Sequence, residues 1–253
     1  MYPSAARQVK VRWAKSANKF LLQERRCHKI GFGGVVRYMN WFRIPLALAA
    51  ATLLASPQTA PSPNKDEHLA ERQDIVIRGL PDSGYILDIG GGCRGTIGRI
   101  KPKQVVAIDI SPRELKEAPS DFLKIVMDAT DLKFLDNSFP AVTAYYSLMF
   151  MKPDIQQKVF AEVFRVLQPG GTWLVWDSVV PAATPGSENE TFTAWLRTIL
   201  PNESIVYGYS ILKFAMPLDV PYYSALAAQA GFQVAEVKEE GGGKSFSMRL
   251  RKP

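Results

Sequence analysis

Residues 85–95 combine residue types and spacing that build a nucleotide site. An apolar run from Tyr85 leads to Asp88, and glycines follow at positions 90, 91, 92 and 95. A buried parallel strand that ends in a tight glycine-rich turn is how open α/β sheets bind nucleotides. Glycine lets the backbone approach a ligand closely and adopt dihedral angles that other residues avoid. Residues 96–100 either begin a helix or remain in the loop.

Two classes of ligand fit such a turn. A dinucleotide places its pyrophosphate on a helix N-terminus, and the spacing of Gly90, Gly92 and Gly95 agrees with a dinucleotide motif. S-adenosylmethionine (SAM) has no phosphate, but carries an amino-acid end, a ribose and a sulfonium cation. A carboxylate near the turn suits that ligand, and Asp88 supplies one. An NAD(P)-dependent oxidoreductase is therefore the alternative, and the acid just before the first glycine disfavours it.

Two further carboxylates follow predicted strands. Asp109 ends the apolar run 103–109, 19 residues after Gly90, and Asp128 follows the run 122–127. A carboxylate at the end of the second strand can accept hydrogen bonds from both ribose hydroxyls. Taken together, the two carboxylates favour a ligand site over two solvated strand ends.

Four segments now occur in an order and spacing typical of one family. They are Leu87-Asp88-Ile89-Gly90-Gly91-Gly92, Val105-Val106-Ala107-Ile108-Asp109-Ile110-Ser111, Asp128-Ala129-Thr130-Asp131-Leu132-Lys133-Phe134-Leu135-Asp136-Asn137-Ser138-Phe139 and Glu162-Val163-Phe164-Arg165-Val166-Leu167-Gln168-Pro169-Gly170-Gly171. With them the chain resembles a class I SAM-dependent methyltransferase, in the group of the type-11 methyltransferase domain. That group includes C-methyltransferases of quinone biosynthesis. The resemblance covers about residues 70–253.

The resemblance implies SAM as the cofactor and assigns roles to single residues. Asp88 lies near the ammonium group, Asp109 binds the ribose, Asp128 accepts from the adenine amino group and Ala129 offers its backbone N–H to the ring. Ser147 and Leu148 lie beside the sulfonium. The complete expected cofactor set is Asp88, Gly90, Gly91, Gly92, Asp109, Ile110, Asp128, Ala129 and Ser147. The chain departs from the family pattern at Arg94, which stands where a third glycine is usual, and at Pro140, which replaces an acid.

The hydrophobic pattern predicts a doubly wound, mostly parallel seven-stranded sheet that ends in an antiparallel hairpin. The expected strands are 85–89, 103–109, 122–127, 141–147, 172–176, 232–238 and 245–251, and the expected helices are 66–80, 112–118, 154–167 and 222–230. Asp154 is the expected N-cap of its helix, and Pro169-Gly170-Gly171 its expected end. Residues 66–253 form the predicted methyltransferase domain.

The segment 178–221 is longer than an ordinary loop and rich in aromatic residues. Its position predicts a cap over the site, and its apolar content favours a small apolar or aromatic substrate. No residue stands out as a catalytic base: His68 precedes the first strand, and alternation places Tyr145 and Tyr146 on opposite faces of theirs. A SAM-binding module without turnover is therefore a further alternative.

Charge separates the first 64 residues from the rest of the 253-residue chain. Residues 1–64 hold ten Lys or Arg and one acid, whereas residues 65–253 carry a net charge of −2. The core therefore offers no basic patch for nucleic acid. Two cysteines and two histidines in unrelated contexts indicate neither a disulfide framework nor a metal site.

The basic leader, residues 1–65, contains the short apolar run 44–55 and a Pro/Ser-rich linker. The run is too short to span a bilayer as a helix. The alternatives are an export or anchoring segment, a membrane tether through residues 39–60, or an unstructured tail from an upstream start codon. Because SAM is made in the cytosol, we expect the domain to be cytoplasmic. The sequence does not define the oligomeric state.

Overall fold

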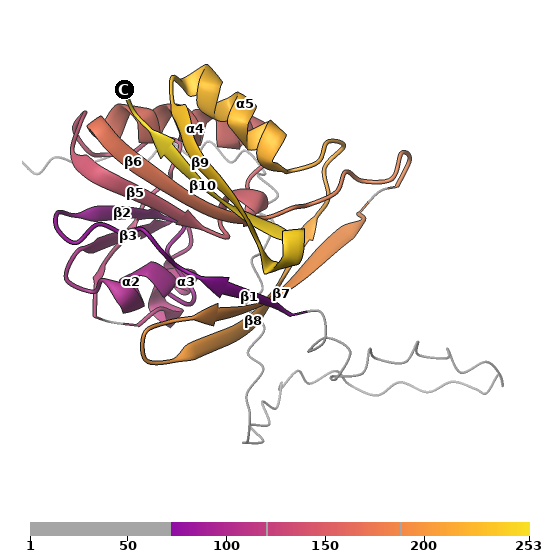
Figure 1. Cartoon of the computed structure of the whole chain (residues 1–253), viewed down its shortest axis with the longest axis horizontal. Helices are drawn as coiled ribbons and strands as arrows, with labels where there is room; N and C mark the ends of the chain where they lie inside the picture. The colour runs from indigo at the N-terminus through magenta and orange to yellow at the C-terminus, as the bar shows by residue number, and fades with distance from the viewer. Residues whose placement is uncertain (1–71, 120, 188) are drawn as a thin grey trace, which may run out of the picture.

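The computed structural model describes residues 72–119, 121–187 and 189–253. The expectations for the leader, and for Cys27, His28 and His68, lie outside these residues. A seven-stranded sheet carries helices on both faces, and a three-stranded sheet lies at one side (Figure 1). No helix within the described ranges is long and apolar enough to cross a membrane.

The large sheet has the predicted class and a single reversed strand. In spatial order its strands are β4 (Leu123–Val126), β3 (Val105–Asp109), β2 (Ile86–Ile89), β5 (Phe139–Tyr145), β6 (Leu167–Ser178), β10 (Ser245–Arg251) and β9 (Gln233–Glu240). Strand β2 pairs in parallel with β3 and β5, and β10 is antiparallel to both β6 and β9. The mostly parallel sheet with a closing antiparallel hairpin is confirmed.

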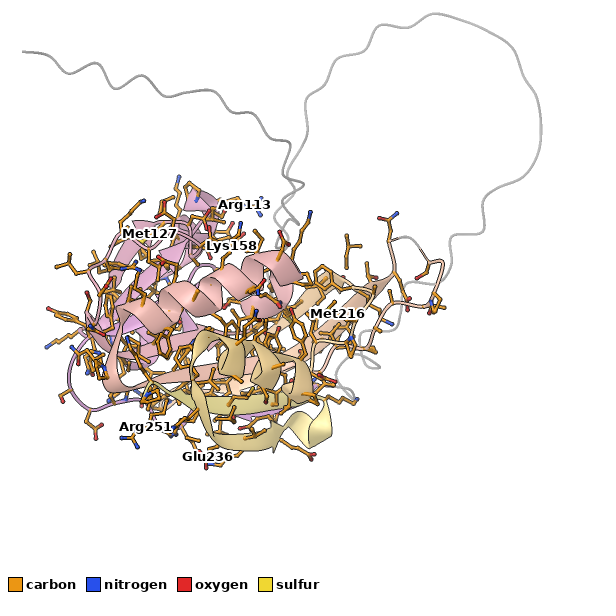
Figure 2. The ribbon with its side chains drawn as sticks, turned by 90° about the horizontal axis from the view of Figure 1, so that it is seen from above. Arg113, Met127, Lys158, Met216, Glu236 and Arg251 are labelled. Atoms are coloured by element: carbon orange, nitrogen blue, oxygen red, sulfur yellow. The ribbon has the colours of Figure 1, made fainter. Side chains whose placement is uncertain are left out.

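Helices cover the two faces of this sheet. The helices are α2 (Thr96–Ile100), α3 (Pro112–Glu117), α4 (Pro153–Val166) and α5 (Val220–Ala230), with short 3₁₀ turns η1 (Leu148–Phe150) and η2 (Gly241–Gly243). Helices α4 and α5 lie side by side on one face, as Figure 2 shows from above. Helices α2 and α3 pack on the other side, against β3, β4 and β5 (Figure 1). Residues 96–100, left open by the sequence, are helical.

An aromatic core joins α4 and α5 to the sheet. Trp173 of β6 is fully buried, with its ring centroid 4.6 Å from that of Phe160 on α4. Phe232, just after α5, lies 5.7 Å from Trp173 and 5.0 Å from Phe164 between ring centroids. Each such ring contributes roughly 1.5–3 kcal/mol by leaving water. Val159, Phe160 and the rest of the predicted apolar face of α4 thus hold the face of the sheet opposite α2 and α3.

The helix expected at 66–80 is wrong for the part that the structure describes. Residues Gln73–Val76 form strand β1, and residues 77–80 are irregular. Gln73 and Ile75 are buried while Asp74 is exposed, which is the alternation of a strand. Strand β1 pairs in parallel with β7 (Thr191–Ile199), which pairs antiparallel with β8 (Ser204–Leu212). Residues 73–76 are extended despite their helical spacing, because they pair with a strand more than 110 residues away in the sequence.

The boundaries of α4 also differ from the prediction. Its N-cap is Lys152, with Pro153 in the first turn, so Asp154 is not the cap but an acid in the first turn. The helix ends at Val166, and β6 begins at once with Leu167, which pairs with Phe139. Pro169-Gly170-Gly171 therefore belongs to the extended start of β6 rather than to the end of the helix. A register shift between Phe139 and Ala141 accommodates Pro140 near the start of β5.

The fourth family segment contains an arginine that binds the loop between β4 and β5. The guanidinium of Arg165 donates to the backbone carbonyls of Leu132 and Phe134 at 2.8 and 2.9 Å. It also donates to both carboxylate oxygens of Glu162 at 2.8 Å and to Asp136 at 2.7 Å. Glu162 accepts the backbone N–H of Leu132 in turn. These contacts hold a loop that contains no helix against α4.

We expect Arg165→Met to lower the free energy of unfolding by about 2 kcal/mol, because two carbonyls and a partly buried carboxylate lose their donor. The Arg165 hydrogen bond lowers the pKa of Glu162. The stabilisation is therefore present above the ordinary carboxyl pKa and is lost as the pH falls through the lowered pKa. Urea titrations at neutral and acid pH measure this. Lys158→Met, an exposed change on the same helix, is the control, and an equal effect of both variants at neutral pH would contradict the role.

Candidate functional site

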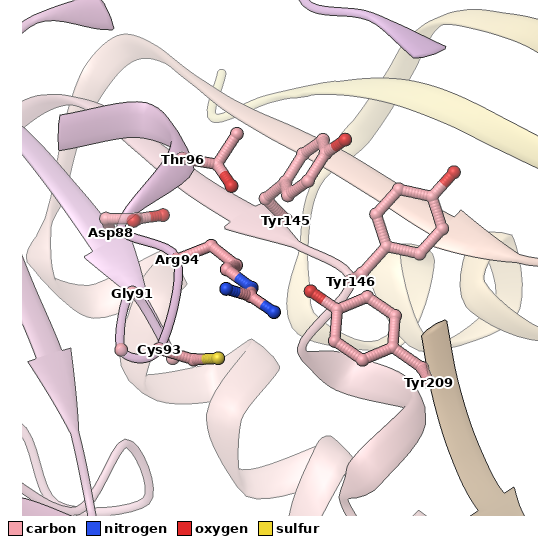
Figure 3. A pocket seen from close by; sticks show the side chains of 10 residues that line it. Asp88, Gly91, Cys93, Arg94, Thr96, Tyr145, Tyr146 and Tyr209 are labelled. Carbon is pink, nitrogen blue, oxygen red and sulfur yellow. The ribbon is translucent and has the colours of Figure 1, made fainter. Parts of the chain in front are cut away.

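A pocket lies at the topological switch point of the large sheet. From β2 the chain proceeds to β3 and β4, then crosses back to place β5 on the other side of β2. Ligands of open α/β sheets bind beyond the carboxyl ends of the strands at such a point. The pocket there measures about 370 Å³ including its opening to solvent, and the loop after β2 forms one wall (Figure 3).

Asp88 is fixed at the floor of this pocket. Its side chain is only 2% exposed, and one carboxylate oxygen accepts a hydrogen bond of 2.8 Å from the hydroxyl of Thr143 on β5. Thr143 itself is fully buried. This hydrogen bond sets the orientation of the carboxylate, and the sequence analysis had not singled out Thr143 for it.

The glycine loop has no space for side chains at two positions. A Cβ atom at Gly91 would lie 2.4 Å from a carboxylate oxygen of Asp88 and 2.9 Å from the Cβ of Ala107. A Cβ atom at Gly92 would lie 2.9 Å from a carboxylate oxygen of Asp109. Gly90 has a φ of +69°, which a residue with a side chain rarely adopts. The loop is thus a cradle of bare backbone between two acidic side chains.

Asp109 lies at the carboxyl end of β3, beside this loop. It is 3% exposed, and its carboxylate accepts the backbone N–H of Ser111 at 2.9 Å, which shapes the turn into α3. The next residue, Ile110, leaves 51% of its surface exposed. A buried acid followed by an exposed apolar side chain fits a ribose with an adenine ring beside it. The structure places the Asp109 carboxylate beside Gly92, although Asp109 and Ile110 are not among the residues that line the pocket.

Asp128 and Ala129 lie apart from that group, after β4 at the next strand end. The exposed carboxylate of Asp128 accepts the backbone N–H and the hydroxyl of Thr130, each at 2.8 Å. The link to the site is through the backbone, since the N–H of Met127 donates to the carbonyl of Asp109 at 3.0 Å. Their adenine role stays a prediction.

Ser147 follows the tyrosines at the end of β5 but is not one of the residues that line the pocket. Its side chain is 1% exposed, and its hydroxyl donates to the backbone carbonyl of Ile89 at 2.7 Å. The hydroxyl therefore joins the ends of β2 and β5, the two strands that flank the pocket. Leu148 begins the turn η1 and is fully buried.

The expectation that Tyr145 and Tyr146 face opposite sides of the sheet is wrong. Both side chains are at least nine-tenths buried, and both line the pocket (Figure 3). Tyr146 has a φ of +46°, so the chain turns there instead of continuing the alternation of a strand. A bulky residue in this left-handed region is a strained exception. This backbone conformation brings the ring of Tyr146 to the pocket beside that of Tyr145.

Burial disfavours the ionised form of these tyrosines, which argues against a role as catalytic base. Burial raises the pKa of Tyr145, and that of Tyr146, well above the usual value of 10. Both phenols stay protonated at neutral pH, so they form an aromatic wall and do not accept protons. The ring of Tyr146 stacks on that of Tyr209 from β8, with centroids 6.0 Å apart.

The hairpin of β7 and β8 closes the pocket from the side. The hydroxyl of Thr198 on β7 hydrogen bonds to both Tyr145 and Tyr207, and all three side chains are buried. Arg99 of α2 forms an ion pair of 2.8 Å with Glu203 in the turn between β7 and β8. The hairpin thus docks on α2 and on the end of β5. The alternating pattern of residues 191–199 was a readable strand signal that the sequence analysis did not use.

We expect Thr198→Val to destabilise the protein by about 1–2 kcal/mol, because valine keeps the shape but leaves two buried phenols without this partner. The hairpin should open more often, which peptide-resolved hydrogen exchange over residues 204–212 would detect. Thr193→Val, at an exposed position of the same strand, is the matched control. Equal protection in both variants would show that this hydrogen bond does not hold the hairpin.

Comparison with known proteins indicates the family of this domain. A family model described as "Methyltransferase domain" matches residues 87–175. The ubiquinone/menaquinone biosynthesis C-methyltransferase UbiE of Desulfotalea psychrophila is 38% identical over 121 residues, 44% of this chain and 48% of that protein. The sterol 4-C-methyltransferase strm-1 of Caenorhabditis elegans is 32% identical over 123 residues, 44% of this chain and 35% of that protein.

The fold has a counterpart among solved structures. The crystal structure of the PH0226 protein from Pyrococcus horikoshii OT3 superposes with a TM-score of 0.51 at 20% identity, covering 68% of this chain and 84% of that one. The chain spans less than half the length of the two curated relatives named above.

Strand order, glycine cradle and family match together identify the domain. The chain contains a class I SAM-dependent methyltransferase domain, distantly related to the UbiE methyltransferases. SAM is the methyl donor of this family. The alternative of a NAD(P)-dependent oxidoreductase is set aside by the same match.

Proposed function

We propose that this protein transfers a methyl group from SAM to a small apolar or aromatic molecule. The observation that carries the proposal is the juxtaposition of the glycine cradle with a wall of tyrosine rings in one pocket (Figure 3). The missing side chains at Gly91 and Gly92 let the loop backbone pack closely against the carboxylates of Asp88 and Asp109, so that both acids lie next to the loop that lines the pocket. The wall formed by Tyr146 and Tyr209 offers flat apolar surface to an acceptor.

Each of the site residues has a role that follows from the chemistry of its side chain. Asp88 suits an ammonium group and Asp109 suits ribose hydroxyls, so the two ends of the loop hold the cofactor. When bound, SAM supplies a methyl carbon already activated by the positive sulfur. The tyrosine wall and the hairpin hold the acceptor in line and exclude water, which is the main demand of such a displacement.

The pocket suits an acceptor that needs no base from the protein. Of the described residues that line it, none is a histidine or a lysine, and burial raises the pKa of Tyr145 and of Tyr146. A nucleophile that ionises by itself, or that attacks without losing a proton first, fits this environment. The names of the two curated relatives, a quinone-biosynthesis and a sterol methyltransferase, support an apolar acceptor with rings.

We further propose that residues 178–221 act as the substrate cap and that the domain works in the cytoplasm. The docking of β7 and β8 beside the cradle supports the cap. SAM is made in the cytosol, which supports a cytoplasmic location for the domain.

Transfer of a labelled methyl group tests the function. The 253-residue chain is incubated with SAM carrying a radioactive methyl group and with panels of hydroquinones, phenols and sterols, followed by extraction into organic solvent. We expect label in the extract from at least one panel, and none with the Asp109→Asn variant. Binding of S-adenosylhomocysteine (SAH) without transfer to any panel would instead indicate a SAM-binding module without turnover.

A further inference from the structure

We propose that Arg94 binds the carboxylate of the amino-acid end of SAM, an inference that rests on the proposed function. Arg94 stands where the resembling family usually has a third glycine, and the structure directs its side chain into the pocket. Figure 3 shows it extending between the glycine loop and the rings of Tyr146 and Tyr209.

The backbone around Arg94 is fixed by several hydrogen bonds. The N–H of Cys93 donates to the carbonyl of Glu114 at 2.7 Å, and that of Gly95 to the carbonyl of Gly92 at 3.2 Å. The carbonyl of Arg94 accepts a hydrogen bond of 2.8 Å from the side chain of Arg99. Cys93 and Gly95 both have a positive φ, so the chain folds back on itself at this point. These constraints fix the position of the Arg94 Cα atom at the edge of the glycine loop, from which the side chain extends.

An aromatic ring also places the guanidinium. The Cζ atom of Arg94 lies 5.8 Å from the ring centroid of Tyr207, within the range of a cation–π contact. Tyr207 is 1% exposed, so the cation lies against an environment of low polarity. An anionic ligand is attracted more strongly by a guanidinium there than by one in open water.

The charges of the pocket match the ligand end that it would receive. Asp88 and Arg94 contribute the acidic and the basic side chain, and the other described residues that line the pocket are glycine, cysteine, threonine and tyrosine. The amino-acid end of SAM is a zwitterion with one ammonium and one carboxylate group. With Asp88 facing the ammonium group, Arg94 is the residue whose charge and planar donors suit the carboxylate.

A competing role for Arg94 is purely structural. Its contact with Tyr207 would then only join the glycine loop to the hairpin, and its removal would weaken every ligand of the pocket alike. The two roles differ for a ligand that lacks the amino-acid end. Methylthioadenosine has the same adenine, ribose and thioether sulfur as SAH, but no ammonium and no carboxylate group.

Calorimetric titration of the 253-residue chain with SAH and with methylthioadenosine separates the two roles. We expect Arg94→Gln to weaken SAH about 30-fold, in the range for loss of a charge-assisted hydrogen bond, and to change methylthioadenosine less than twofold. Arg94→Lys should recover part of the SAH affinity, because it keeps the charge without the planar fork. Arg251→Gln, an exposed change at the end of β10, is the control and should change neither.

Each other outcome overturns the inference. Equal weakening of both ligands would show that Arg94 only shapes the loop, and unchanged SAH affinity would show that it does not touch the carboxylate. If Arg94→Gln fails to fold, Arg94→Lys decides the question. The inference is overturned if Arg94→Lys binds SAH as tightly as Arg251→Gln does, with the affinity for methylthioadenosine also unchanged. A wild-type protein that binds neither ligand would overturn the proposed function itself, which keeps the two failures distinct.

Discussion

Replacing Gly91 by alanine is expected to weaken SAH binding on the order of 100-fold and to lower the free energy of unfolding by about 1–3 kcal/mol. The added methyl group would lie 2.4 Å from the Asp88 carboxylate and 2.9 Å from Ala107 on β3. Asp88 cannot move aside freely, because it is buried and held by Thr143. Either the carboxylate or the loop must shift, and both contact the expected ligand. Calorimetry with SAH and thermal melting measure the two effects.

Gly186→Ala provides the control for this substitution. Gly186 has a φ of +81°, but nothing lies within 4 Å of the position of an added Cβ atom. Its replacement should cost about 1 kcal/mol in stability through backbone strain and leave SAH affinity unchanged. If Gly91→Ala bound SAH as tightly as Gly186→Ala, the loop after β2 would not be the cofactor cradle.

We expect Asp109→Asn to weaken SAH binding on the order of 100-fold with little loss of stability. Asparagine keeps the oxygen that accepts the backbone N–H of Ser111, so the turn into α3 should be preserved. It removes the negative charge from a side chain that is 3% exposed, and with it two charge-assisted hydrogen bonds to a ribose. Titration with SAH gives the affinity, and denaturation in urea checks the stability.

Asp82→Asn is the matched control, because the side chain of Asp82 is fully exposed and forms an ion pair with Lys101 at the surface. It should leave SAH affinity unchanged. If Asp109→Asn behaved in the same way as Asp82→Asn, the ribose assignment would be wrong, and the carboxylate would serve only the turn.

Features encoded locally could be predicted from the sequence. Strands β2 and β3 are apolar runs with an acid as the next-to-last and the last residue, respectively, and both acids lie beside the glycine loop as expected. The hairpin of β9 and β10 shows alternation on both sides of three glycines, and β10 has the predicted bounds, residues 245–251. Helix α5 ends at residue 230 as predicted, and Gly231, with a φ of +98°, follows it.

Features that depend on residues far away in the sequence could not be predicted in this way. Strand β1 appears helical by spacing, and only its pairing with β7 makes it a strand. The positive φ of Tyr146 arises where β5 meets η1 and the hairpin, so alternation could not reveal that both tyrosines face the pocket. Thr143 has no motif around it, and its role follows only from the register of β5 with β2.

Titration of the 253-residue chain with SAM and with NAD in a calorimeter tests the central claim most directly. A glycine cradle between Asp88 and Asp109, in a domain of the methyltransferase family, predicts micromolar binding of SAM and no binding of NAD. Binding of NAD alone, or of neither compound, would contradict the assignment of this pocket to SAM.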